Sequence, residues 1–438
     1  MRKALLLVLA LLALGVGVTA AQSDLESVDP TGVTITYWHQ FTNVQAETMT
    51  ALVEQFNSTN EYGITVEAIA QGNYNDIRNL VNAGIVSGEL PNLVAGFGND
   101  AASYFRDGAA QDLRPFLDSA AWGLGDMADD YRSDLLPFNS LPSGEVIAFP
   151  HQTSAQVLAY NQTLLSELGF EGPARSWDDF KAQACAAANY TGPNGEDVQG
   201  YPITTDSSLF ESWVASQGGV IFDGENYVFD SEPVVNAFQL YADLYAQGCA
   251  YIPAERFAEQ ADFARGLNPF FATSTAGFTF IVQAFVDSGY EAEWSVTTFP
   301  YAEGQEVLQV FIPSIILVGG TPEEQVASWL FLKSLVAPEA GAQWSSSTGY
   351  FGASRAGQAM LTDETAFGSP QIFPYFTVVN DTLNSGVRLY SGPSISAQGT
   401  VRGLISEAIA NVTSNGMSVE EAVGILQAGA DQALADSQ

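Results

Sequence analysis

Side chains suited to nucleophilic or metal chemistry are few in this sequence. The 438-residue chain has only two histidines, His39 and His151, and two cysteines. Each histidine follows a segment with strand character and could face a cleft, but neither has a neighbouring Ser or Cys to activate. The chain also lacks the G-x-S-x-G and H-E-x-x-H motifs. We therefore predict no catalytic residue, no metal site and no cofactor.

A glycine-rich segment, GFGNDA at residues 96–101, matches the G-x-G-x-x-A pattern of dinucleotide sites. It follows the third predicted strand, whereas the dinucleotide motif follows the first strand of its βαβ unit. The sequence after Asp118 has the pattern of loop and helix, where that motif requires a second strand. We interpret the segment as a strand-end loop whose backbone can approach a ligand.

Aromatic side chains indicate a different kind of site, one for a sugar-like ligand. Tyr74 and Tyr350 lie in polar surroundings, and Trp38 ends a predicted strand. Aromatic rings can stack on the C–H faces of a sugar, while hydroxyls and amides bond its OH groups. Trp213 could line a cleft or pack its helix against the rest of the protein, and its sequence context leaves both alternatives open.

The net charge excludes two classes of partner. Lys and Arg number 14 against 50 Asp and Glu, which gives a formal charge of −36. Nucleic-acid binding needs clustered Lys and Arg, and docking on anionic lipid needs a polybasic face. The chain is nevertheless 47% hydrophobic and 12% aromatic, which is enough for large cores, and its length suggests two or three domain-sized units.

The first residues have the pattern of an export signal. Arg2 and Lys3 precede an apolar stretch, residues 5–18, that is too short to span a bilayer comfortably, and small residues follow. We expect cleavage after about residue 21 and a soluble protein secreted to the periplasm or beyond the membrane. The less favoured alternative is an uncleaved anchor.

Cys185 and Cys249 are the only cysteines, and each lies near the end of a predicted helix. In an oxidising compartment we favour a disulfide between them, and the alternative is a pair of buried thiols. A bridge closing a loop of this size stabilises the chain by about 4 kcal/mol in the chain-entropy model.

The order of strand and helix patterns predicts an α/β fold. Strand patterns at 32–38, 64–70 and 92–97 alternate with helical patterns at 43–57 and 74–87, which indicates a mainly parallel, buried sheet. Further strands are predicted at 146–149, 157–160, 271–280 and 294–299. Further helices are predicted at 177–188, 233–248, 322–335, 338–348 and, with a break at 415–416, 393–436.

From residue 33 to the C-terminus, a series of motifs resembles the extracellular solute-binding proteins of ABC importers. Their order and spacing match the pattern of that family. The motifs are Tyr37-Trp38-His39, Val53-Glu54-Gln55-Phe56-Asn57, Val157-Leu158-Ala159-Tyr160-Asn161, Ser176-Trp177-Asp178-Asp179-Phe180, Ala327–Leu335, Pro338-Glu339 and Thr348-Gly349-Tyr350.

The resemblance implies a two-lobed α/β fold of the Venus-flytrap type, with three crossovers between the lobes. After a signal peptide at 1–21, the first lobe would comprise 30–152 plus 302–349, and the second 158–299 plus 354–438. The hinges would lie near Ser154, Pro300 and Tyr350. The lobes would close on a small-molecule solute without breaking a bond, and the loaded form would be recognised by permease subunits with their ATPase.

Likeness to the glycerol-phosphate-binding members of the family implies a set of ligand residues. The matched positions are Tyr74, Ser154, Ser274, Tyr350 and Arg402. A phosphate could be bound by the planar guanidinium of Arg402 and by serine hydroxyls, so glycerol 3-phosphate or a glycerophosphodiester is favoured. His39 and Trp213 are further candidates. Two positions depart from the family pattern, because Gly98 replaces a cleft glutamate and Ile312 lies near the place of a glycine.

Two alternatives remain open from the sequence. The same fold could bind a neutral sugar or oligosaccharide. A secreted glycosidase or phosphodiesterase is the alternative from another class, because 50 carboxylates leave an acid pair possible. Most of these carboxylates lie on predicted helix faces and at helix ends, where solvation is the ordinary explanation.

Overall fold

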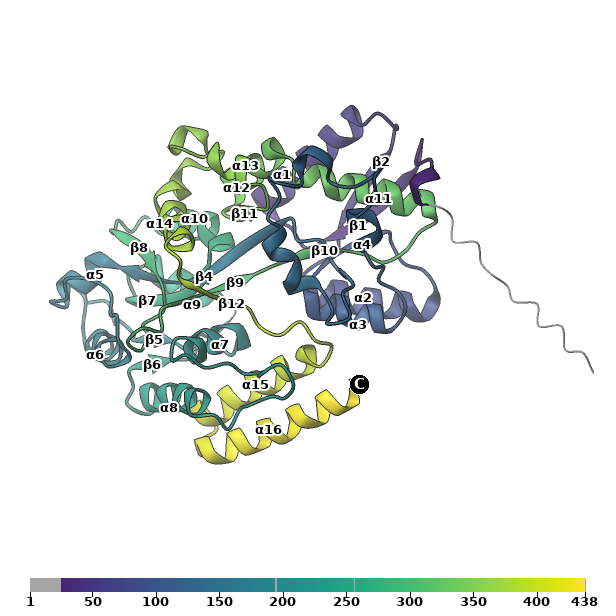
Figure 1. Cartoon of the computed structure of the whole chain (residues 1–438). Coiled ribbons are helices and arrows are strands. Elements are labelled where there is room, and N and C mark those ends of the chain that lie inside the picture. Colours follow the sequence, from purple (N-terminus) through teal and green to yellow (C-terminus); the bar gives the residue numbers. More distant parts are fainter. Residues whose placement is uncertain (1–24, 194, 256, 438) are drawn as a thin grey trace, which may run out of the picture.

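The computed structural model describes residues 25–193, 195–255 and 257–437, so the predicted signal peptide at 1–21 lies outside the described residues. Two main sheets organise the chain (Figure 1). The first has four strands in the order β10-β3-β1-β2. Its strands are β1 (Thr34–His39), β2 (Thr65–Ala70), β3 (Leu93–Gly96) and β10 (Ser314–Leu317).

The second sheet is built around one long strand, β4, which crosses from one half of the molecule to the other (Figure 1). β4 pairs antiparallel with four strands, and β12 pairs with β9. The strands are β4 (Gln152–Asn161), β7 (Phe270–Ser274), β8 (Trp294–Thr297), β9 (Val307–Phe311), β11 (Phe351–Gly352) and β12 (Arg388–Tyr390). A small parallel pair consists of β5 (Tyr201–Pro202) and β6 (Ala250–Tyr251).

Helices follow most strands, and those between β1, β2 and β3 make the parallel pairing possible. In the N-terminal half they are α1 (Asn43–Thr59), α2 (Tyr74–Ser87), α3 (Gly98–Arg106), α4 (Arg114–Leu117), α5 (Gln162–Glu167), α6 (Trp177–Ala188) and α7 (Ser207–Ala215). The later ones are α8 (Glu232–Ala246), α9 (Ala258–Phe263), α10 (Phe278–Ser288), α11 (Pro322–Leu335), α12 (Pro338–Thr348), α13 (Arg355–Ala359), α14 (Phe373–Asn384), α15 (Gln398–Thr413) and α16 (Val419–Asp436).

Short 3-10 turns complete the chain. They are η1 (Leu25–Ser27), η2 (Gly125–Met127), η3 (Ser133–Asn139), η4 (Thr275–Gly277), η5 (Glu364–Ala366) and η6 (Pro370–Ile372). The strand predicted at 271–280 was half wrong, because β7 ends at Ser274 and a helical turn leads into α10. The apolar run FTFIVQAFV is nine residues long, and it packs as a helix with Phe278 and Ile281 buried.

Separate hydrophobic cores lie on the two sheets. The core of the four-stranded sheet includes Tyr37, Val94, Ile316 and Trp329. Two clusters, one around Trp213 and another around Phe271, fill the other half of the molecule. We call these halves the first and second lobe.

The chain passes between the lobes at three places. β4 begins the first passage, and β11 pairs with its start at the third. At the second, β9 pairs with β4 and β12, whereas β10 pairs with β3, so the crossing lies between Phe311 and Ser314. The boundaries from the sequence analysis stay predictions, and we propose moving the second hinge from Pro300 to Ile312–Pro313.

A disulfide joins Cys185, in α6, to Cys249, just before β6. This confirms the predicted pairing over the alternative of two buried thiols. Both cysteines contact the core of the second lobe, where Cys249 is buried. In the part of the chain that the structure describes, no helix has the length and apolar character of a membrane span.

Candidate functional site

Three tyrosines of the first lobe gather beside the crossovers, and we call them the tyrosine wall: Tyr37, Tyr74 and Tyr350. Tyr37 belongs to the buried face of β1. Tyr74 is the first residue of α2, placed by a capping box in which the Asn73 side chain accepts from the N–H of Asp76. Tyr350 follows Gly349, which ends α12 with a φ of 79° that favours glycine.

Burial raises the pKa of all three phenols. Burial is the main cause in each case, and the pKa of Tyr350 rises to about 12. Tyr350 adds to the rise at Tyr37 and Tyr74 because the hydroxyls are close. The Tyr74 hydroxyl lies near that of Tyr350, but it forms no hydrogen bond of normal geometry to any described residue, and neither does the Tyr37 hydroxyl. The wall therefore keeps buried hydroxyls available.

His39, a further candidate from the sequence, packs into the same region. Its ring stacks on Phe41 at 5.5 Å and lies 5.6 Å from Tyr37. Its Nδ1 accepts a hydrogen bond from the Phe41 N–H, and burial lowers its pKa to about 4. His39 is therefore a neutral, packed side chain at pH 7. Burial lowers the pKa of His151 to about 3, so it too is neutral.

The two predicted serines lie at the start of the second lobe, next to the tyrosine wall. Ser154 is buried in β4, and Ser274 ends β7 opposite Gln156. Thr275, the next residue, accepts a hydrogen bond from the N–H of Ala155. The backbone of Gly349 also approaches Thr275, since a Cβ there would lie 2.3 Å from its carbonyl oxygen. The structure thus brings the segments carrying Tyr74, Tyr350, Ser154 and Ser274 together.

The second lobe contributes a polar wall, which we call the amide wall: Gln156, Gln309, Glu211, Ser212 and Gln398. All five side chains are buried. The Ser212 hydroxyl bonds to both Gln156, at 3.0 Å, and Gln309. Glu211 accepts from the Tyr390 hydroxyl at 3.1 Å and from Gln398 Nε2 at 3.3 Å. Burial raises the pKa of Glu211 to about 7 against the opposing effect of Arg402.

Arg402 extends the amide wall from the first turns of α15. Its guanidinium donates to the Ser208 hydroxyl at 2.7 Å and approaches the Asp206 carboxylate at 3.5 Å. The side chain stays 39% exposed, so it keeps donors for a further partner.

Trp213, on the same helix as Glu211, is placed differently. It is 0% exposed and packs against Trp177, Phe180, Tyr201 and Phe299 in the core of the second lobe. This placement favours the packing alternative. A buried ring surrounded by other rings has no face left for a ligand.

Two side-chain hydrogen bonds join the lobes. The Ser394 hydroxyl donates to the carbonyl of Phe138 at 2.8 Å, and Gln45 Nε2 donates to the carbonyl of Ala276 at 3.2 Å. Ser394 lies close to Gly98, the position at which the sequence analysis expected a departure from the family pattern. A Cβ at Gly98 would lie 2.5 Å from the Ser394 hydroxyl and 2.9 Å from the Phe138 carbonyl, so a larger residue would require Ser394 or the Phe138 backbone to shift.

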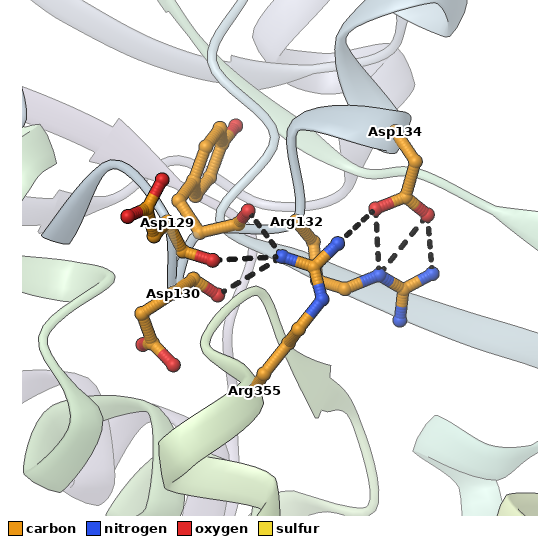
Figure 2. Close-up of polar contacts among 6 residues, drawn as sticks. Asp129, Asp130, Arg132, Asp134 and Arg355 are labelled. Atoms are coloured by element: carbon orange, nitrogen blue, oxygen red, sulfur yellow. Dashed lines mark hydrogen bonds and ion pairs between the residues drawn. The ribbon is translucent and has the colours of Figure 1, made fainter.

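A second arginine cluster shows what a purely structural guanidinium looks like (Figure 2). Arg355 donates to the carbonyls of Asp129, Asp130 and Tyr131 and to the Asp134 carboxylate at 3.2 Å. Asp134 is also held by Arg132, which is the main cause of its lowered pKa. These contacts fix α13 to the first lobe just after the third crossover.

The surface also has a hollow of about 330 Å³ on the outside of the second lobe, lined by Val282, Phe285, Tyr290, Trp294 and Tyr375 among others. It contains none of the predicted ligand residues. Among the described residues, no group of three or more His, Cys, Asp or Glu side chains could hold a metal ion.

Comparison with known proteins identifies the family. Residues 51–366 match the family described as bacterial extracellular solute-binding protein. The chain belongs to this family. That assignment confirms the resemblance drawn from the sequence motifs.

Relatives of this solute-binding protein include the sn-glycerol-3-phosphate-binding periplasmic protein UgpB of Agrobacterium fabrum, 24% identical over 288 residues. UgpB of Brucella abortus is 23% identical over 282 residues. Each alignment covers 62% of this chain, and the chain spans only 62% of the length of either relative.

Solved structures share the fold at lower identity. UgpB from Mycobacterium tuberculosis in complex with glycerophosphocholine has a TM-score of 0.76 at 17% identity, covering 92% of this chain and 99% of that one. The GacH receptor of Streptomyces glaucescens, solved with acarbose, has a TM-score of 0.76 at 16% identity, covering 93% and 100%. This agreement confirms the predicted two-lobed α/β fold.

The sequence analysis missed Tyr37 and the members of the amide wall. For Tyr37 a signal existed, because the alternation in Thr34–His39 places Tyr37 and His39 on one face of the strand. For Glu211 the sequence contained no such signal. Its hydrogen-bond partners Tyr390 and Gln398 lie 179 and 187 positions away in the sequence.

Proposed function

We propose that this protein is the solute-binding component of an ABC importer and closes its lobes around a small, uncharged polyhydroxylated solute. Family membership supports the binding role. One observation supports the choice of an uncharged solute: Arg402 and Arg78 are both already paired with carboxylates. Outside the cytoplasm, the loaded protein would deliver its solute to the permease subunits, which work with an ATPase.

The charge balance at the two walls favours a neutral solute. Arg402 is paired with Asp206 and lies close enough to Glu211 to lower its pKa. In the first lobe, Arg78 of α2 is paired with the buried Asp100 at 2.6 Å. A phosphate dianion would meet these carboxylates and a chain charge of −36. A sugar or polyol instead matches rings, hydroxyls and amides.

A phosphate ester is the second candidate. Arg402 is the observation in its favour, because a guanidinium with free donors beside the Ser208 hydroxyl can bind phosphate. Relatives named for binding sn-glycerol 3-phosphate add support. In this alternative, phosphate would displace Asp206 from Arg402.

The enzyme alternative receives less support. Glu211 has the raised pKa of a general acid, but its carboxylate oxygens accept hydrogen bonds from Tyr390 and Gln398 within the wall. A glycosidase requires two carboxyl groups that flank the scissile bond. We therefore propose binding without turnover.

Isothermal titration calorimetry with maltose, glycerol, glycerol 3-phosphate and glycerophosphocholine tests the proposal. We expect a neutral polyol or sugar to bind more tightly than either phosphate compound, at both low and high salt. Tighter phosphate binding that weakens with salt would support the second candidate. Release of product from a glycoside or a glycerophosphodiester would overturn the binding-only role.

A further inference from the structure

Two glutamines of the amide wall lie side by side on the second sheet. β4 and β9 pair antiparallel with Ser154 opposite Phe311, and the same register places Gln156 opposite Gln309 two positions further along. On its other side, Gln156 lies opposite Ser274 of β7. Directly paired residues point to the same face of a sheet, so both glutamines share a face with Ser274, one of the predicted solute residues.

Ser212 of α7 holds both glutamines. Its hydroxyl lies 3.0 Å from the Gln156 amide and also bonds the Gln309 amide. All three side chains are buried. A serine hydroxyl has a single hydrogen, so it can donate to only one of two amide oxygens. If both oxygens faced Ser212, one contact would bring two oxygens together with no hydrogen between them.

The other glutamine must therefore turn its NH2 group towards Ser212. The oxygen and nitrogen of a carboxamide are similar in size, so the group can turn over without changing its shape. The Ser212 hydroxyl bonds no further side chain or carbonyl among the described residues. Its hydrogen thus goes to one glutamine, and its oxygen accepts from the NH2 group of the other.

The far end of each glutamine stays available. Neither end forms a hydrogen bond to a described residue, and neither is fully enclosed. With one amide turned over, the pair presents one NH2 group and one carbonyl oxygen. Hydroxyls both donate and accept, so two neighbouring hydroxyls match this pair, whereas a phosphate dianion offers only acceptors and would meet the carbonyl oxygen.

We infer that Gln156 and Gln309 form a subsite for two hydroxyls on neighbouring carbons of the solute, and that Ser212 is the positioning residue that keeps the two amides turned in opposite directions. This inference rests on the proposed function, because it assumes that the solute lies against this face of the second sheet. It adds a substrate class, a vicinal diol, to the neutral solute proposed above.

Calorimetry on Ser212→Ala tests the inference, with maltose and glycerol 3-phosphate as probes. Without the hydroxyl, both amides can turn their NH2 groups towards the solute. The affinity for maltose should fall about tenfold, while the affinity for glycerol 3-phosphate should stay the same or rise. The ratio of the two affinities should therefore fall about tenfold or more. An unchanged ratio, with or without a uniform loss of affinity, would overturn the inference.

Two further variants separate selectivity from structural damage. Ser212→Thr keeps the hydroxyl and should keep the wild-type ratio. Ser216→Ala is the matched control, because it removes another buried hydroxyl at the end of the same helix, one that donates to the Trp213 carbonyl at 2.8 Å. It should lower the melting temperature without changing the ratio. An equal fall of the ratio in Ser216→Ala would contradict the role of Ser212.

Neutron diffraction of the deuterated, solute-free protein reads the amide orientations without any probe. We expect one glutamine to direct its ND2 group at Ser212 and the other its oxygen. Two oxygens or two ND2 groups facing Ser212 would overturn the inference. Wild-type protein that binds neither probe, or that prefers glycerol 3-phosphate, would count against the proposed function, while the diffraction would still decide the arrangement of the amides.

Discussion

The tyrosine wall and the amide wall differ in whether their buried polar atoms are hydrogen-bonded. In the tyrosine wall, the hydroxyls of Tyr37 and Tyr74 form no hydrogen bond of normal geometry to the described residues. In the amide wall, the Ser212 hydroxyl donates to Gln156, and the Gln398 amide donates to the Glu211 carboxylate. From this difference we infer that the first lobe supplies hydrogen-bond donors to a solute, whereas the second lobe determines the shape and charge of the site.

Truncating the amide wall should therefore cost stability, and this is the largest effect that we expect. Glu211→Ala leaves the Tyr390 hydroxyl and the Gln398 amide buried without their acceptor. We expect the free energy of unfolding to fall by about 2–4 kcal/mol, measured by chemical denaturation. Glu47→Ala, on an exposed face of α1, is the control and should change it by less than about 0.5 kcal/mol.

The pH dependence of stability should reveal Glu211 directly. Its pKa is raised from 4.5 to about 7, so folding favours the protonated carboxyl. This contribution is fully present below about pH 4.5 and is lost as the pH rises through 7. Across this range the free energy of unfolding should fall by up to about 3 kcal/mol.

Glu211→Gln should remove that pH dependence, so that the remaining change of the free energy of unfolding with pH comes from the other titratable groups. Arg402 and Tyr390 lower the pKa of Glu211, whereas Asp206 raises it, so Asp206→Asn should shift the transition to lower pH. An unchanged stability profile in Glu211→Gln would show that the carboxyl is not buried as described.

The tyrosine wall should show the opposite behaviour, with loss of binding but not of stability. Tyr74→Phe removes a hydroxyl that forms no hydrogen bond of normal geometry to a described residue, so the free energy of unfolding should change by less than about 0.5 kcal/mol. Solute affinity should fall about tenfold, measured by calorimetry. A stability loss with unchanged affinity would reverse the proposed roles of the two walls.

Arg402 should have the smallest effect on a neutral solute. Arg402→Gln is expected to change the affinity for a sugar less than about threefold, because a neutral solute offers no charge for the guanidinium, which already bonds Ser208 and Asp206. A loss greater than about thirtyfold, seen only with glycerol 3-phosphate, would instead support phosphate binding. Arg355→Gln is the control, since that guanidinium bonds only within the cluster of Figure 2.

Much of the fold could be predicted from the sequence. The alternation in 32–97 is local, so the parallel strands and their helices follow from short-range pattern, and the disulfide follows from there being only two cysteines. The segment 271–280 misled the prediction, because its aromatic and β-branched residues suit a strand, whereas the structure ends the strand at Ser274 and begins a helix at Phe278.

The site was less accessible to sequence reasoning. The motifs led to Tyr74 and Tyr350, which the structure brings together with Tyr37. The amide wall depends on contacts between positions such as Gln156 and Ser212, which no local pattern connects. The role of Gly98 also required the structure, because Ser394 reaches it from the other lobe.

Hydrogen–deuterium exchange with and without maltose tests the central claim most directly. If both walls enclose the solute, protection should rise together at 72–76 and 348–352 in the tyrosine wall and at 152–156, 207–212 and 272–276 in the second lobe. Protection confined to one lobe, or found only around the hollow at Tyr290 and Trp294, would contradict the account of a solute held between the two walls.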